Sequence, residues 1–356
     1  IGLGIPAEPL FRSRSCHYNV ERYQVLAAQI VKQDNDLAIM LYAPRYVGGL
    51  AKIASDCGED IKRRYWKSVN VCFTGEDVEN IVRELVNVNR YSSAIDIICY
   101  ARGPVQICDL EIVNILYSYL FQSASSRSQL DIYHIKTLLE RLDKSEDPEV
   151  IKVLIMVEFL LYRVLEHQMD MSSTRFVKEL SRNPELMIQL VELAYISDDG
   201  SQEQLEGVAA KNRKVYGECA SHILLFGRNL VSFMNDKGEL DGAFMKQYID
   251  KLYDLAKERK RLGVIDYVVG NLLGDIPRDE NYPPRELCAV VEELQSDVVD
   301  QHIRIRIVNS RGIISRSYNE GGDRERSIVA RLEEYKQKTK LLYPRMTKIF
   351  DDLIEI

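Results

Sequence analysis

Apolar residues recur at helical spacing almost throughout this chain, in segments that come in pairs separated by short turns. One pair begins near Val25 and resumes after a turn at 34–36. Another lies at about 50–57 and 60–69, and a third surrounds the turn at Asn89 and Arg90. Spacings of three and four residues place apolar side chains on one face of a helix. The sequence therefore predicts an all-α protein built from antiparallel helical hairpins.

Two of these hairpins are similar to each other. Ile81 lies 56 positions after Val25, and at the same offset Ala94 and Ile95 follow Ala38 and Ile39. One hairpin cannot bury its apolar face alone, so repeated hairpins stack on their neighbours. We therefore expect an α-solenoid of helical hairpins, TPR/HEAT-like, over residues 20–182, after an irregular segment at 1–19.

Longer periodic segments follow, and they predict a C-terminal helical bundle over residues 183–356. We expect its long helices at about 204–226, 243–262, 284–308 and 323–343. Asp147-Pro148 and Asn183-Pro184 each have the pattern of a helix N-cap followed by proline at the first helical position. These two sites predict helix starts at 148 and 184.

One stretch, 303–307, can be interpreted in two ways. Its isoleucines and arginines alternate as they would in a strand. A helical stripe from Leu287 to Val308 nevertheless passes through it. We favour a central helix buried on two faces, with Ile303 and Ile307 on the second face.

Composition and charge limit the classes of function. The formal net charge of -7 disfavours binding of nucleic acid or an anionic membrane through the overall field. The seven cysteines are scattered, which fits buried thiols in a reducing cytoplasm better than a disulfide framework. The most apolar stretch, 153–165, is interrupted by Glu158 and Arg163, so we expect no membrane partner. The chain begins at Ile1 without methionine, and we expect it to belong to a longer polypeptide.

No segment has a catalytic or cofactor-binding signature. Phosphate-loop and dinucleotide motifs are absent from the sequence. Cys219 and His222 could form half of a metal site, but Cys288 and His302 are single and distant in sequence. A buried thiol beside a partly exposed histidine is the favoured interpretation. We expect no enzymatic activity, no metal and no cofactor in this chain.

Arginines form the densest charge feature. Guanidinium groups match the geometry of phosphate and carboxylate groups. Acidic residues between them, such as Asp323 and Glu325, favour an internal ion-pair network, with a nucleic-acid contact as the alternative. The candidate interaction surface comprises Arg304, Arg306, Arg311, Arg316, Arg324 and Arg326, with Arg331 nearby.

The stretch 309–312 predicts a structural motif within this segment. Gly312 is expected just past a helix end in a left-handed conformation. Asn309 or Ser310 would then start or cap the next turn.

Three groups of residues carry a resemblance that runs through most of residues 60–350. They are 65–69 with 76–77 and 91–96, then 183–186 with 190–195, and finally 309–312, 320–322, 325–326, Tyr335 and 343–345. In order and spacing they resemble the C-terminal helical-repeat region of large multidomain bacterial proteins. That architecture is similar to STAND-type NTPases and other anti-phage defence proteins. The resemblance implies a region that senses a ligand for an upstream domain, and it supplies no catalytic residue.

These observations predict a non-enzymatic recognition or scaffold module. Its expected partner is another protein or an upstream domain of the same polypeptide. The alternative is a nucleic-acid-binding module that uses the arginines at 304–331.

Overall fold

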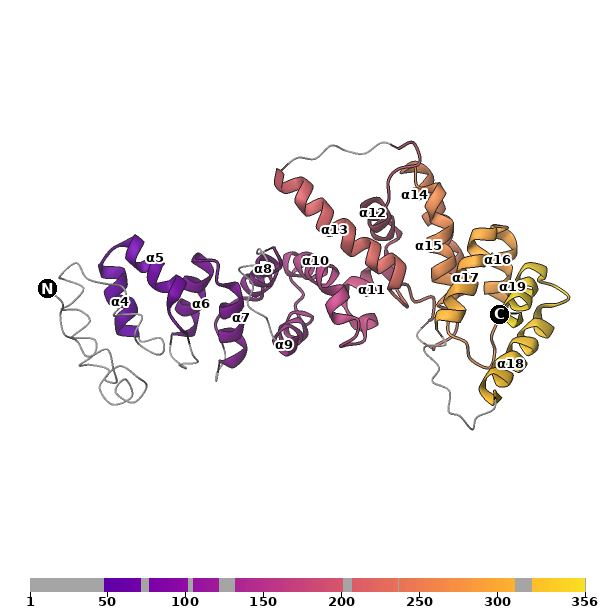
Figure 1. Ribbon diagram of the computed structural model, residues 1–356, viewed down its shortest axis with the longest axis horizontal. Helices are drawn as coiled ribbons and strands as arrows, with labels where there is room; N and C mark the ends of the chain where they lie inside the picture. The colour runs from indigo at the N-terminus through magenta and orange to yellow at the C-terminus, as the bar shows by residue number, and fades with distance from the viewer. Residues whose placement is uncertain are drawn as a thin grey trace. The chain divides into compact units, whose positions relative to one another are not determined.

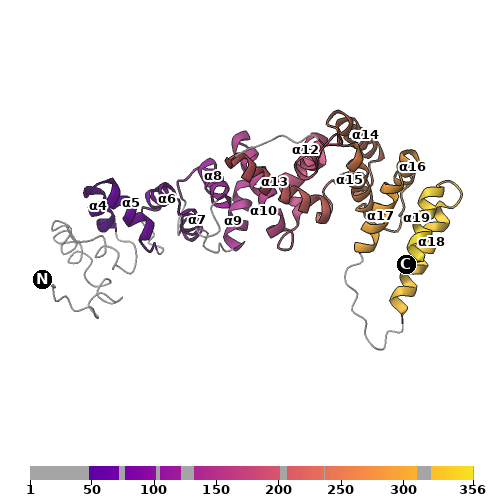
Figure 2. The ribbon, with the colours of Figure 1, turned by 45° about the horizontal axis from the view of Figure 1, so that its top comes forward.

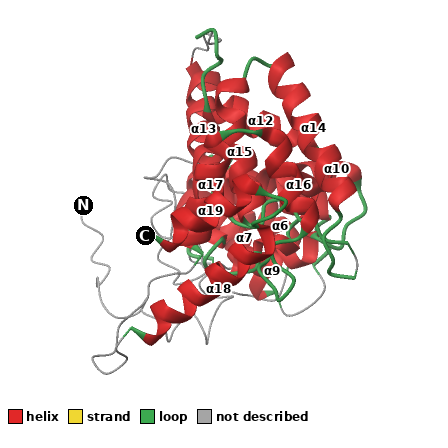
Figure 3. Ribbon diagram, turned by 90° about the vertical axis from the view of Figure 1, so that its right-hand side faces the viewer, coloured by secondary structure: helices red, strands yellow, loops and turns green. Residues whose placement is uncertain are grey.

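The computed structural model describes residues 48–71, 77–101, 105–121, 132–200, 207–235, 237–310 and 322–355. Over these ranges the regular structure is helical, apart from one isolated bridge between Met234 and Leu240 (Figure 3). The predicted all-α class is therefore confirmed. The helical pairs are compatible with an α-solenoid, and the type of repeat stays a prediction. The segment 1–19 and the hairpin near Val25 lie outside the described residues.

The chain divides into two compact units, residues 1–157 and 158–356. The domain boundary predicted after residue 182 falls inside the second unit. In the first unit each described helix contacts the next, and α7 also contacts α9 (Figure 1). The helices are α4 (Gly48–Asp56), α5 (Glu59–Ser68), α6 (Val78–Asn87), α7 (Tyr91–Tyr100), α8 (Asp109–Leu120) and α9 (Ile132–Leu142). The boundary between the units lies in α10 (Pro148–Leu165).

The turn between α6 and α7 lies within one helical pair and also bonds to the preceding pair. Asn89 adopts the left-handed conformation at φ 61°, and the amide of Arg90 returns to the carbonyl of Leu85 at 2.8 Å. This geometry closes the end of α6. The Arg90 guanidinium then donates to the carbonyls of Trp66 at 3.0 Å and Val69 at 2.6 Å, at the end of α5. One side chain therefore satisfies exposed carbonyls of the preceding pair, which links neighbours along the chain.

In the second unit, helices also contact helices that do not directly follow them in the sequence, as in a bundle. α12 contacts α13 and α14, α15 contacts α17, and α19 contacts α16, α17 and α18. Figure 2 shows α18 and α19 side by side. The helices are α11 (Arg175–Arg182), α12 (Pro184–Ala194), α13 (Gly207–Phe226), α14 (Gly242–Glu258), α15 (Leu262–Gly274), α16 (Arg285–Leu294), α17 (Asp297–Asn309), α18 (Asp323–Thr339) and α19 (Pro344–Ile354), with a short 3₁₀ helix, η2 (Met171–Ser173), before them.

The two predicted helix starts are confirmed. The Asp147 carboxylate accepts from the Glu149 amide at 2.9 Å, and the Asn183 side chain accepts from the Glu185 amide at 3.1 Å. Pro148 and Pro184 open the helices, where no amide proton is needed.

Removing one of these caps has a predictable cost. We expect Asn183→Ala to lower the free energy of unfolding by about 1 kcal/mol, because the Glu185 amide loses its acceptor. Asn183→Ser keeps a capping oxygen, so its free energy of unfolding should lie within a few tenths of a kcal/mol of that of the parent protein. Urea denaturation followed by circular dichroism measures both variants. An equal loss in the alanine and serine variants would show that the cap is not the cause.

The prediction of one continuous helix over 284–308 is wrong, because two helices cover this segment. Gln295 takes a left-handed conformation at φ 49° and ends α16. The Ser296 hydroxyl then accepts from the Val299 amide at 3.3 Å and starts α17. The stretch 303–307 is helical, so the favoured choice over a strand is confirmed.

Burial on two faces of that helix is also wrong. Ile303 and Ile307 are buried, whereas Val298 and Ile305 are 44% and 38% exposed. The new start at Ser296 sets which residues α17 presents to the bundle, so the stripe from α16 does not continue through it.

Two other long helices end earlier than predicted. The helix predicted at 243–262 ends at Glu258, and the helix predicted at 323–343 ends at Thr339. The helices that follow, α15 from Leu262 and α19 from Pro344, were not predicted. Periodicity alone did not detect these breaks, because apolar residues continue at helical spacing on both sides of each turn.

Candidate functional site

The structure places the predicted interaction arginines in different environments. Arg304 forms an ion pair with Asp352 of α19. Arg306 is 6% exposed, lies 3.5 Å from Asp275 and donates to the carbonyl of Gly227. Both side chains therefore hold α17 to its neighbours within the second unit.

The remaining predicted arginines are not brought together with these two. Arg324, Arg326 and Arg331 are exposed on α18, and Arg326 pairs with Asp323 one turn away. Arg311 and Arg316 lie outside the described residues, as does Gly312. An exposed pair such as that of Arg326 contributes little to stability.

The predicted structural motif lies at the end of α17. Asn309 is the last helical residue and its carbonyl accepts from Arg228 at 2.8 Å. Ser310 is the C-cap, and its hydroxyl donates to the Ile307 carbonyl at 2.7 Å and accepts from Arg278. The motif therefore closes α17 in the part of it that the structure describes.

Cys219 and His222 each contact a different residue. His222 Nε2 lies 2.7 Å from the Glu166 carboxylate, and Cys219 is half-buried with its thiol pKa raised by burial. Burial raises the pKa of Cys288 to about 12. Thiols of this kind remain protonated and unreactive at neutral pH. Among the described residues, no three His, Cys, Asp or Glu side chains gather in a way that could hold a metal ion.

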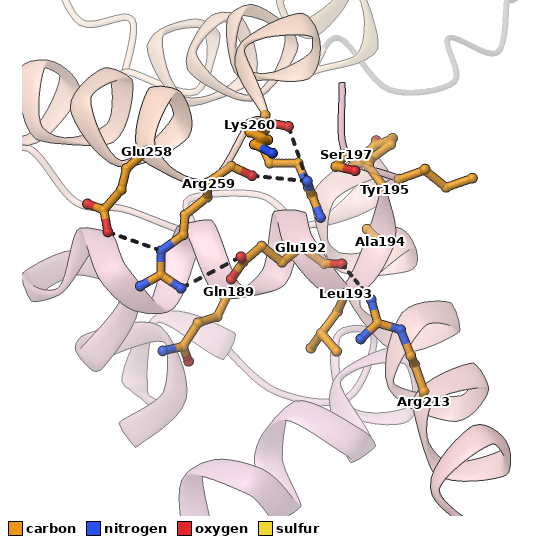
Figure 4. A pocket seen from close by; sticks show the side chains of 12 residues that line it. Gln189, Glu192, Leu193, Ala194, Tyr195, Ser197, Arg213, Glu258, Arg259 and Lys260 are labelled. Atoms are coloured by element: carbon orange, nitrogen blue, oxygen red, sulfur yellow. Dashed lines mark hydrogen bonds and ion pairs between the residues drawn. The ribbon is translucent and has the colours of Figure 1, made fainter. Parts of the chain in front are cut away.

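A cavity of about 700 Å³ in the second unit brings together charged side chains that are distant in sequence (Figure 4). Its walls are the last turn of α12, residues 195–197 that follow it, Arg213 of α13, and the turn between α14 and α15. Four basic and two acidic side chains line it: Arg213, Arg259, Lys260, Arg261, Glu192 and Glu258.

The turn between α14 and α15 positions three of the four basic residues. Lys260 has φ 55°, a left-handed conformation that glycine adopts more readily than lysine. The Arg261 amide donates to the Ala256 carbonyl at 2.7 Å, which closes α14. The Lys260 carbonyl accepts from the Asp198 amide at 2.9 Å, and the Asp198 carboxylate accepts from the Gly263 amide at 3.2 Å. The turn is therefore fixed against the segment after α12.

Two of the basic residues at the cavity are neutralised by carboxylates. Arg259 lies 3.6 Å from Glu185, 3.7 Å from Glu192 and 3.8 Å from Glu258. Lys260 pairs with Asp199 at 2.7 Å. Figure 4 shows Arg259 between Glu192 and Glu258.

The other two basic residues of the cavity, Arg261 and Arg213, have no carboxylate within ion-pair distance in the part of the chain that the structure describes. Arg261 is 8% exposed, and its Nη1 donates to the carbonyls of Arg259 at 3.0 Å and Lys260 at 3.1 Å. Its Nε is buried without a hydrogen-bond partner. Arg213 donates to the Glu192 carbonyl at 3.3 Å (Figure 4). Both guanidinium groups therefore bring a positive charge to the cavity that no described carboxylate offsets.

Aromatic and apolar groups form the adjoining wall. Tyr195 packs edge-to-face on Tyr267, with ring centroids 6.3 Å apart, and Tyr267 packs on His302 at 4.4 Å. Burial, with Tyr267 nearby, raises the pKa of Tyr195 to about 12, so its hydroxyl stays neutral at physiological pH. Ile196 is 60% exposed beside the cavity.

This arrangement can hold a negatively charged group. Guanidinium forks bind carboxylates through charge-assisted hydrogen bonds, which are stronger than neutral ones. Sequence reasoning missed the cavity, although the basic run at 259–261 was visible. The run fell inside a predicted continuous helix, and periodicity held no sign that a left-handed turn would direct Arg261 inward.

Comparison with protein-family models, with curated proteins and with solved structures found no match for this chain. Within the described ranges, every helix is too short or too polar to span a lipid bilayer.

Proposed function

We propose that this chain is a non-enzymatic recognition module that binds a partner protein at the cavity of its second unit. The observation that carries the proposal is the pair Arg213 and Arg261, whose charges meet no carboxylate from another described residue. An uncompensated charge in a partly buried site is unfavourable unless a ligand supplies the opposite charge.

The chemistry of the cavity supports binding rather than proton transfer. The carboxylates of Glu192 and Glu258 are held in ion pairs with Arg259, and Tyr195 remains protonated. The partner is a separate protein or, as the resemblance to sensor regions of STAND-type proteins implies, another domain of the same polypeptide. The same resemblance supports a cytoplasmic bacterial sensor of the anti-phage defence kind as part of this proposal.

Capture of the partner tests the proposal. The immobilised chain is exposed to lysates of its own host, with and without phage infection, and retained proteins are identified by mass spectrometry. The expected result is a protein retained by the folded chain and not by the same chain after denaturation. No such protein under either condition would overturn the proposal.

A second candidate function is nucleic-acid binding through α18. Arg324 and Arg331 are exposed there, and neither forms an ion pair with another residue that the structure describes. Phosphate contacts of this kind make binding strongly dependent on salt. The candidate requires salt-sensitive binding to DNA or RNA that is lost when Arg324 and Arg331, or Arg311 and Arg316, become glutamate. Binding that ignores salt would exclude it.

A further inference from the structure

We infer that the guanidinium groups of Arg213 and Arg261 form the seat for a carboxylate of an acidic peptide segment, with an adjoining apolar residue resting on Ile196. This inference rests on the proposed function and names the group that the cavity recognises.

The first support is how the structure uses the Arg261 side chain. It is more than nine-tenths buried, yet only one of its nitrogens donates to described atoms, and both acceptors are carbonyls of its own turn. Its Nε is buried and has no hydrogen-bond partner among the described residues. Arg306 and Arg345 also have such an Nε, but their guanidinium groups pair with carboxylates, whereas Arg261 has no described carboxylate within ion-pair distance. The buried charge of Arg261 therefore lacks the partner that buried charges normally have. A carboxylate is the acceptor that suits two adjacent guanidinium nitrogens.

The second support is the backbone that places this side chain. Lys260 is held in a left-handed conformation that costs a residue with a side chain about 1 kcal/mol or more. The Asp198 amide, the Asp198 carboxylate and the Arg261 amide all bond to this turn or its neighbours. Strained conformations maintained by surrounding structure are concentrated at ligand-binding sites.

The charge balance favours a carboxylate over a more highly charged ligand. Glu192 and Glu258 also line the cavity, and they would repel a phosphate with two negative charges. Arg259 and Lys260 are already neutralised, which leaves the two charges of Arg213 and Arg261 for the ligand. A carboxylate carries half the charge of such a phosphate, so Glu192 and Glu258 repel it less.

The size and the wall of the cavity favour a peptide. A volume of about 700 Å³ exceeds what one small anion fills. Ile196 exposes most of its side chain beside the arginines, and Tyr195 contributes the face next to it. An acidic residue with an apolar neighbour matches both features of this wall.

A side-chain NMR titration of the full chain tests the assignment. The probes are acetyl-Leu-Glu-amide, its uncharged counterpart acetyl-Leu-Gln-amide, and inorganic phosphate. We expect saturable shifts of the Arg261 Nε–H resonance with the glutamate peptide and at least about tenfold weaker binding of the glutamine peptide, since a hydrogen bond to a charged group is stronger than one to a neutral group. Phosphate should bind more weakly than the glutamate peptide.

Variants separate the seat from the fold of the turn. Arg213→Gln should weaken the glutamate peptide about tenfold or more, and it leaves the α14–α15 turn untouched. Arg261→Gln should do the same, with circular dichroism to confirm folding. Lys214→Gln is the matched control, because Lys214 follows Arg213 on α13, is exposed and does not line the cavity, and it should change affinity less than about threefold.

Several outcomes would overturn the inference. They are equal binding of the two peptides, tighter binding of phosphate, or unchanged affinity in Arg213→Gln and Arg261→Gln. A captured partner retained equally by these variants would also overturn it and leave the proposed function standing. Peptide binding at this seat without any captured partner would overturn the proposed function and leave this inference standing.

Discussion

Arg306→Ala is expected to lower the free energy of unfolding by about 3–5 kcal/mol, because it leaves the buried carboxylate of Asp275 without its positive partner. The two side chains are 6% and 12% exposed. The substitution also removes the donor to the Gly227 carbonyl, which joins the end of α13 to α17. The loss is measured by denaturation at neutral pH with urea, an uncharged denaturant that does not screen ion pairs.

The loss of stability in Arg306→Ala should depend on pH, and the titration of Asp275 sets the direction of this dependence. Burial raises the pKa of this carboxyl above its usual value, and Arg306 acts in the opposite direction. Without Arg306 the folded-state pKa rises further. The folded variant then takes up a proton at a pH where its unfolded chain is still ionised, so acidification through that raised pKa stabilises the folded state. The difference between Arg306→Ala and the parent protein should therefore shrink as the pH falls below neutral.

Two comparisons make this prediction decisive. Arg326→Ala removes an exposed arginine whose partner Asp323 is also exposed, and it should change stability by less than about 0.5 kcal/mol. Replacing Arg306 and Asp275 together with leucine should cost less than Arg306→Ala alone, since no buried charge is left unpaired. A loss in Arg306→Ala that does not change with pH would contradict the role assigned to Asp275.

Gly270→Ala is expected to lower the free energy of unfolding by about 1–2 kcal/mol, although alanine is the better helix former. A Cβ at Gly270 would lie 2.6 Å from the Cβ of His302 and 2.8 Å from the Val299 carbonyl oxygen. One turn later, a Cβ at Gly274 would lie 2.5 Å from the Cβ of Arg306. Helix α15 therefore meets α17 along two glycines spaced four apart, where backbone and Cβ atoms cannot yield without moving a helix.

The double variant Gly270→Ala/Gly274→Ala should lose about 2–4 kcal/mol, measured by the same urea titration. Gly263→Ala, near the start of the same helix, is the control. Its added Cβ would lie 3.0 Å from a carboxylate oxygen of Asp198, whose exposed side chain can rotate while the Asp198 amide keeps its bond to Lys260. The control should stay within about 0.5 kcal/mol of the parent protein. A gain in stability at Gly270, as helix propensity alone would predict, would show that the two helices are not in this close contact.

Sequence patterns predicted those features of the fold that depend on near neighbours along the chain. Apolar spacing located α6 and α7, and the pairs Asn183-Pro184 and Asp147-Pro148 located helix starts that the hydrogen bonds confirm. The turn at Asn89 was also predicted. The physical reason is that amphipathic faces and caps use residues within about one or two turns of each other.

Breaks inside periodic segments escaped prediction for a related reason. Gln295 and Lys260 end helices in left-handed conformations, although neither residue type favours them. Tertiary contacts hold these turns: the Asp198 amide bonds to the Lys260 carbonyl, and the Asp266 carboxylate accepts from the Ser296 hydroxyl. A local pattern contains no record of partners that lie 30 or more residues away.

By itself, the sequence determined that this protein is all-helical and where most of its helices begin, because these properties follow from local spacing and capping. Only the tertiary structure decided which arginines hold helices together and which line the cavity. Arg306 and Arg261 look alike in sequence, yet Arg306 meets Asp275, whereas Arg261 lines a cavity and has no described carboxylate within ion-pair distance of its guanidinium. The difference arises because the free energy of a charge depends on its burial and on its partners, and both are set by segments distant along the chain.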